Sequence, residues 1–150
     1  TRTMTLNALF FVPFACDAPQ AIDRIGLEIS TLGASSVVRL GVYSDVGGVP
    51  SALLLDAGTI DASTTGWKEI NISLTFSGLV WPCAVAQVAG CTAQGFSGIL
   101  PTVGYNFGAA AGLPADHYSQ TGITGALPTT ATVDFNQSSN IGPRIRLRAA

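Results

Sequence analysis

Charged side chains are scarce in this chain. Asp, Glu, Lys and Arg make up 11% of its 150 residues, whereas about a quarter is usual in soluble domains. Disordered chains combine low hydrophobicity with high net charge, but here 47% of the residues are hydrophobic and the formal net charge is −2. Lys68 is the one lysine in the sequence, so the basic field that binds nucleic acid is missing. These absences exclude disorder and nucleic-acid binding, and they predict a compact domain.

Long hydrophobic runs are also missing. The longest two, residues 8–16 and 79–86, fall short of the roughly 18 apolar residues of a membrane-spanning helix, and each contains a proline. We therefore expect no membrane insertion. The first run is similar to a short signal peptide, but Pro13 interrupts it, so we interpret residues 1–8 as an N-terminal arm or linker. Because the chain begins with Thr1, we expect a processed chain or a piece of a longer product.

Cysteine and histidine are too few for a disulfide framework or a metal centre. The three cysteines, Cys16, Cys83 and Cys91, are irregularly spaced, and no Cys/His cluster accompanies them. Either Cys83 and Cys91 cross-link a hairpin, or all three are buried thiols of a protein assembled in the cytosol, which is the interpretation that we favour. An acidic calcium loop is absent, although Asp56 or Asp61 could contribute to a weak site. We expect no metal and no cofactor.

Catalytic constellations are missing as well. The single histidine, His117, follows Asp116, but no Gly-x-Ser-x-Gly elbow or other nucleophile setting accompanies it. Nothing in the sequence brings two of the nine acidic residues together for glycoside hydrolysis. The turn at Gly47 and Gly48 lacks the lysine and the following helix of a phosphate loop. The sequence therefore predicts a protein that is not an enzyme and has no catalytic residues.

What the sequence does contain is alternation with a period of two residues, which is typical of strands with one buried face. Ile25, Leu27 and Ile29 fall on one face of the first such strand. The apolar run over residues 79–88 predicts a strand that is buried on both faces, with Trp81 in the core. The predicted strands are residues 22–30, 38–43, 67–74, 79–88 and 144–148.

Turn signals separate these strands, at residues 32–34, 45–50, 64–66 and 76–78. This spacing favours an antiparallel sandwich over alternating strands and helices, and 17 glycines and eight prolines agree with it. No segment combines a helical apolar stripe with a capping box. We therefore predict an all-β fold, an antiparallel β-sandwich in a single domain over residues 1–150.

Residues 92–142 form an irregular, loop-rich region in which glycine and proline break up the alternation. The region has few charges but contains several aromatic residues. A low-charge loop region of about fifty residues is unusual in a compact domain unless it is functional or covered by a partner. We therefore expect neighbouring subunits or a ligand to cover it.

The remaining candidate functional residues are of the kind that bind sugars. Sugar sites on β-sandwiches combine aromatic faces, which stack on sugar rings, with polar side chains that hydrogen-bond to hydroxyl groups. Alternatively, Trp67 packs at a strand start, and Tyr105 and Phe107 fill the core or a subunit interface. The candidate ligand-binding residues are Trp67, Tyr105, Asn106, Phe107, Asp116, His117 and Tyr118.

Several segments resemble a pattern in tailed-phage fibre and spike proteins. In that pattern a strand ending in Gly-hydrophobic-Tyr is followed by a Gly-x-Pro turn and by a Leu-rich strand that closes in Ala-Gly. The corresponding segments here are Gly41-Val42-Tyr43, Gly48-Val49-Pro50 and residues 53–60. The similarity continues in Phe10-Phe11-Val12-Pro13-Phe14, residues 22–28, Gly78-Leu79-Val80-Trp81, Ala84-Val85-Ala86-Gln87 and residues 143–148. Residues 90–142 match no pattern of this family, so no binding residue is carried over.

The resemblance implies a jelly-roll-like sandwich, often trimeric, at the tip or C-terminus of a virion fibre. A prophage-derived gene-transfer particle could carry the same module. A homotrimer would also bury apolar surface and so account for the low charge. Arg144, Arg146 and Arg148 of the last predicted strand would then pair with carboxylates of a neighbouring subunit, or form a solvated face.

We weigh three functions. The first is a non-enzymatic virion adhesin domain that binds host cell-surface glycan, through residues 92–142. The second is a purely structural virion module without a ligand, such as a head fibre, a decoration or a fibre-trimerisation domain, and the third is a fragment of a carbohydrate-active enzyme. The expected partners are further copies of the chain, other virion structural proteins and host surface polysaccharide. The expected location is a virion assembled in the cytoplasm of a bacterial host.

Overall fold

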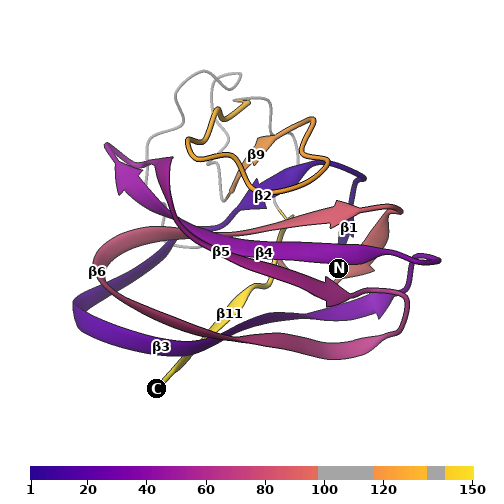
Figure 1. The fold of residues 1–150 in the computed structure, drawn as a ribbon, viewed down its shortest axis with the longest axis horizontal. Coiled ribbons are helices and arrows are strands. Elements are labelled where there is room, and N and C mark those ends of the chain that lie inside the picture. Colours follow the sequence, from indigo (N-terminus) through magenta and orange to yellow (C-terminus); the bar gives the residue numbers. More distant parts are fainter. Residues whose placement is uncertain (98–116, 135–140) are drawn as a thin grey trace.

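The computed structural model describes residues 1–97, 117–134 and 141–150, and these residues form strands and no helix (Figure 1). The predicted all-β fold is therefore confirmed. None of the described residues belongs to a helix long and apolar enough to cross a membrane. The strands are β1 (Arg2–Met4), β2 (Leu9–Phe11), β3 (Phe14–Thr31), β4 (Val37–Val46), β5 (Val49–Asp61), β6 (Gly66–Gln87), β7 (Cys91–Ala93), β8 (Gly95–Ser97), β9 (Tyr118–Gln120), β10 (Ile141–Pro143) and β11 (Arg146–Ala149).

Nine of these strands belong to one antiparallel sheet. Its hydrogen-bonded path runs β1-β7-β3-β6-β2-β9, while β11 pairs with β3 and β4 pairs with both β6 and β5. The other two strands, β8 and β10, form a separate antiparallel pair. Residues 2–4 of the expected N-terminal arm belong to the sheet, because β1 pairs with β7 and the Met4 side chain is fully buried.

One predicted turn is wrong. Residues 76–78 lie inside the 22-residue strand β6, which continues through them and pairs with β3 on both sides. The register of that pairing shifts between Cys16 and Gln20, and Gly78 has a φ of 76°, a conformation that glycine adopts without strain. The turn-like residues therefore mark a bulge at which the two long strands bend.

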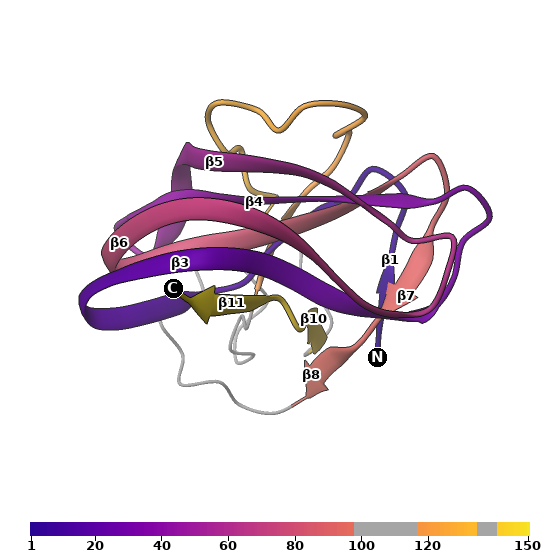
Figure 2. The same ribbon diagram turned by 60° about the horizontal axis from the view of Figure 1, so that its bottom comes forward.

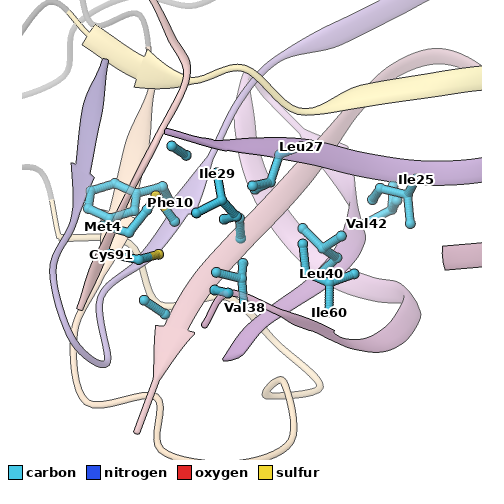
Figure 3. Packing of buried hydrophobic residues seen from close by; sticks show 14 of the residues in the cluster. Met4, Phe10, Ile25, Leu27, Ile29, Val38, Leu40, Val42, Ile60 and Cys91 are labelled. Atoms are coloured by element: carbon cyan, nitrogen blue, oxygen red, sulfur yellow. The ribbon is translucent and has the colours of Figure 1, made fainter. Parts of the chain in front are cut away.

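At this bend the antiparallel sheet curls back on itself (Figure 2). The main hydrophobic core takes residues from two parts of the curled sheet. One part is the later half of β3 with the beginning of β6, and the other is β4, β5 and the end of β6. The predicted inward faces are confirmed. Figure 3 shows side chains of β3 directed toward those of β4 and β5, namely Ile25, Leu27 and Ile29 toward Val38, Leu40, Val42 and Ile60.

A second cluster covers the opposite face of β2, β4 and β6. Tyr118, Ile123 and Leu127 pack there against strand residues that include Trp81, and the end of β6 is consequently buried on both faces, as predicted. The segment that covers this face is residues 117–134. A hydrogen bond holds it to the sheet, because Tyr43 Oη donates to the carbonyl oxygen of Pro128 at 2.6 Å. The buried members of this cluster are Leu9, Phe11, Tyr43, Trp81, Cys83, Val85, Tyr118, Ile123 and Leu127.

Three parts of the loop-rich region are described. Residues 92–97 contribute to β7 and β8, and residues 141 and 142 to β10. The longest part, residues 117–134, is covered by the chain's own sheet. It has the predicted irregular character, with one short strand, β9, and isolated bridges at Thr130 and Asp134. The expectation that a neighbour or a ligand must cover the region is wrong for this part, because its apolar side chains fill the second cluster. Residues 98–116 and 135–140 lie outside the described residues.

The three cysteines are free thiols, and Cys83 and Cys91 are buried, as the favoured interpretation predicts, whereas Cys16 is half-buried. Cys83 lies in the second cluster and Cys91 in the main core, on opposite faces of the sheet. Burial raises the pKa of both thiols, that of Cys83 well above its ordinary value. Both side chains therefore act as neutral, apolar packing groups.

Backbone strain at Val88 provides a test of the turn between β6 and β7. Val88 has a φ of 69°, which a β-branched residue adopts only at a cost of roughly 1–2 kcal/mol. Its side chain is 69% exposed, so little packing is lost on substitution. We expect Val88→Gly to raise the free energy of unfolding by about 1 kcal/mol, measured by urea denaturation.

Val46→Gly is the matched control, because Val46 is 62% exposed and is not among the residues with positive φ. Glycine in an ordinary strand conformation should lower the free energy of unfolding by roughly 0.5–1 kcal/mol. Equal losses in both variants would contradict a strained conformation at Val88.

Candidate functional site

A groove of about 290 Å³ lies on the solvent-facing side of the sheet where β11, β3 and β6 run next to one another. The strand register explains it. Gly26 of β3 pairs with Arg146 of β11 on one side and with Glu69 of β6 on the other. These pairings place the side chains of Arg146 and Glu69 on either side of Gly26. The lining residues are Arg24, Gly26, Trp67, Glu69, Arg146, Leu147 and Arg148.

Position 26 does not tolerate a larger residue without rearrangement. A Cβ atom there would lie 2.3 Å from the carbonyl oxygen of Lys68, which is backbone and cannot turn away. The close approach of β3 to β6 beneath the groove therefore depends on this glycine.

Glu69 connects two groups on one wall of the groove. The Trp67 indole donates a hydrogen bond from Nε1 to Glu69 Oε2 at 2.9 Å. The guanidinium of Arg24 pairs with the other carboxylate oxygen of Glu69. Both oxygens of Glu69 are thus used to hold neighbouring side chains, and the Trp67 side chain is oriented while it stays 41% exposed.

The arginines of the C-terminal strand contribute the other wall. The guanidinium carbon of Arg146 lies over the Trp67 ring, 5.1 Å from its centroid, which is within cation–π distance. Arg148 makes a two-pronged ion pair with Asp23, with nitrogen–oxygen distances of 2.8 and 2.5 Å. Arg146 and Arg148 are both exposed, and each contacts a residue of its own chain.

The carboxylates around the groove are held in the charged form. The hydrogen bond from the Trp67 indole, followed by that from Arg24, lowers the pKa of Glu69. The hydrogen bond from Arg148 lowers the pKa of Asp23. The groove therefore presents fixed charges of both signs beside an aromatic ring.

Seven candidate ligand-binding residues were predicted from the sequence, and three of them are described by the structure, Trp67, His117 and Tyr118. Of these three, Trp67 lines the groove. His117 and Tyr118 are buried, with side chains 1% and 5% exposed, and Tyr118 packs against Trp81 with ring centroids 5.2 Å apart. Both side chains therefore lie in the interior rather than at the surface. Tyr105, Asn106 and Asp116 lie outside the described residues, and so does Phe107.

The arginines and Glu69 of the groove are not among the ligand-binding residues predicted from the sequence. A signal was present, because Arg24, Gly26 and Glu28 alternate with apolar residues, as do Arg144, Arg146 and Arg148. Alternation predicts that these side chains point to solvent, but not which strands lie side by side. Arg144 lies outside the groove and pairs with Glu28 at 3.3 Å.

A metal site finds no support in the described part of the chain, where no three His, Cys, Asp or Glu side chains gather. The two aspartates considered for calcium have other partners. Asp56 pairs with Arg39 at 2.9 Å and accepts a hydrogen bond from the Leu127 amide, while Asp61 accepts hydrogen bonds within the turn that follows β5. Both aspartates hold the fold together.

Comparison of the chain with protein-family models, with curated proteins and with solved structures found no match. The functional assignment therefore rests on the chemistry of the groove.

The Trp67–Glu69 hydrogen bond makes the indole a reporter of the charge on Glu69. Since the folded pKa of Glu69 is lowered below its ordinary value of 4.5, the interaction contributes stability above that pH and loses it as the pH falls through the folded pKa. We expect the Trp67 indole N–H resonance to shift with a midpoint below pH 4.5, as followed by NMR. Glu69→Gln should abolish this transition, and a midpoint at or above 4.5 would contradict the geometry.

Proposed function

We propose that this chain is an adhesin domain of a virion fibre or spike, which binds host cell-surface glycan without chemical conversion. The proposed binding surface is the groove beside Trp67, rather than residues 92–142. The proposal retains the resemblance to tailed-phage fibre and spike proteins and the jelly-roll-like sandwich that it implies. The curled antiparallel sheet, whose main core takes residues from two parts of it, is compatible with that architecture.

One observation carries the proposal, namely a partly exposed tryptophan beside a groove lined by fixed hydrogen-bonding groups. Trp67 offers apolar surface to a sugar ring, and the guanidinium groups of Arg24, Arg146 and Arg148 can donate hydrogen bonds to hydroxyl oxygens. Glu69 holds Trp67 and Arg24 in place. Such preorganisation lowers the entropic cost of binding a flexible saccharide.

Hydrolysis is less compatible with this groove. Glycoside hydrolases use a pair of carboxyl groups that flank the scissile bond. Among the described residues that line the groove, Glu69 is the one carboxylate, and both of its oxygens already contact Trp67 and Arg24. Binding without hydrolysis is therefore the function that we propose.

A glycan array with the purified chain tests the proposal. We expect binding to bacterial surface polysaccharides, and at least a tenfold loss of affinity in Trp67→Ala, because an aromatic stacking contact is worth about 1–1.5 kcal/mol and its apolar area adds to that. Leu54→Ala is the matched control, since Leu54 is 44% exposed and lies outside the groove. Absence of binding across the array, or equal binding by both variants, would rule out this surface.

A structural virion module that forms a homotrimer is the second candidate. It is favoured by exposed apolar side chains at one end of the sheet, Leu6, Leu32 and Val88, which are 44%, 50% and 69% exposed. Their backbone segments lie close together, because Gly33, next to Leu32, lies against the carbonyl of Gly90, and Gly90 lies near the amide of Leu6. A subunit contact would remove this apolar surface from water.

Light scattering tests the trimer. We expect the mass of three 15.4 kDa chains at micromolar concentration, and dissociation toward single chains in Leu32→Asp, since a buried charge without a partner is costly. Val46→Asp is the control, because Val46 is exposed but lies in the β4–β5 hairpin. A wild-type mass of a single chain contradicts the trimer and leaves the glycan proposal to its own test.

A further inference from the structure

We propose that the groove beside Trp67 takes an acidic saccharide, and that Arg146 pairs with the anionic group of the sugar. This inference rests on the proposed glycan-binding function and narrows it to one chemical class. It concerns the same groove but makes a separate claim, because a site for neutral sugars would satisfy the proposed function equally well.

The distribution of charge on the outer face of β3, β6 and β11 points to an anion. Three arginines line the groove, although the chain as a whole has a net charge of −2. Arg24 is paired with Glu69, and Arg148 with Asp23. Within the described residues no carboxylate pairs with Arg146, which leaves one exposed guanidinium for an external partner.

Contacts within the chain restrain the position of the Arg146 guanidinium. It lies over the Trp67 ring at 5.1 Å, and Trp67 is held in turn by the hydrogen bond to Glu69 at 2.9 Å. The Arg146 backbone is fixed by pairing with Gly26. Stacking on an aromatic ring restrains the plane of a guanidinium while its N–H groups remain available along the edges.

The geometry suits a sugar that carries an anionic substituent. A guanidinium binds a carboxylate or a sulfate through two parallel hydrogen bonds, which are stronger than bonds between neutral groups. The apolar surface of Trp67 lies directly beside this anchor, and Arg24 and Arg148 flank it. Because uronates, sialates and sulfate esters share this chemistry, the probes must separate carboxylate from sulfate.

The test compares acidic polysaccharides with neutral counterparts of the same backbone, at fixed ionic strength, by biolayer interferometry on the purified chain. One pair is polygalacturonate and its methyl ester, another is dextran sulfate and dextran, and polysialate is added as a further carboxylate. We expect at least one acidic member to bind at least about tenfold more tightly than the neutral polymers. We also expect that binding to weaken as salt increases.

Two arginine variants provide the matched comparison. Arg146→Gln should lose about tenfold or more in affinity for the acidic polymer, because it removes a charge-assisted pair. Arg144→Gln should stay within about twofold of wild type, since Arg144 is two residues away, pairs with Glu28 and does not line the groove. Far-ultraviolet circular dichroism checks that both variants keep the sheet.

The outcomes separate the two claims. Equal binding of acidic and neutral polymers, or an Arg146→Gln variant that binds like wild type, overturns the inference. If the polymers still bind the wild-type chain and Trp67→Ala weakens that binding, the proposed glycan function stands. Failure of every polymer to bind overturns the acidic-saccharide inference and counts against the glycan function as well.

Discussion

The second half of β6 is the element on which the rest of the structure depends, because it is buried on both faces. Its residues alternate between the main core and the second cluster, so each face must be covered by other parts of the chain. The sheet covers one face by curling at the Gly78 bulge, and residues 117–134 cover the other. Apolar area removed from water on both sides of one strand is the dominant favourable contribution to such a fold.

This division of the sheet also determines where a ligand can bind. The half formed by β4 and the end of β6 is covered by residues 117–134, whereas the outer face of β3 and the beginning of β6 stays open to solvent. The groove lies on that open face, where β11 adds a third strand beside Gly26. Polar residues there are held by ion pairs within the chain, which keeps the surface ordered without a covering loop.

Several strands could be predicted from the local pattern, but the continuity of β6 across residues 76–78 could not. Alternation in residues 22–30 and 67–74 indicated strands with the correct buried faces. The turn-like residues 76–78 proved to be a bulge, because hydrogen bonds to β3, about sixty residues earlier in the chain, continue the strand on both sides. His117 and Tyr118 look like loop residues in sequence but are buried, since nothing local reveals which face of a sheet a loop will cover.

The sequence by itself determined that the chain is all-β, that Ile25, Leu27 and Ile29 share one buried face, and that the strand from residue 79 is buried on both faces. These properties follow from the period of two residues, which is local. The tertiary structure alone decided that Arg146, Gly26 and Glu69 lie side by side on three different strands. Strand register is set by pairing between distant segments, and a shift of one residue would move each side chain to the other face. The groove therefore exists only once that register has formed.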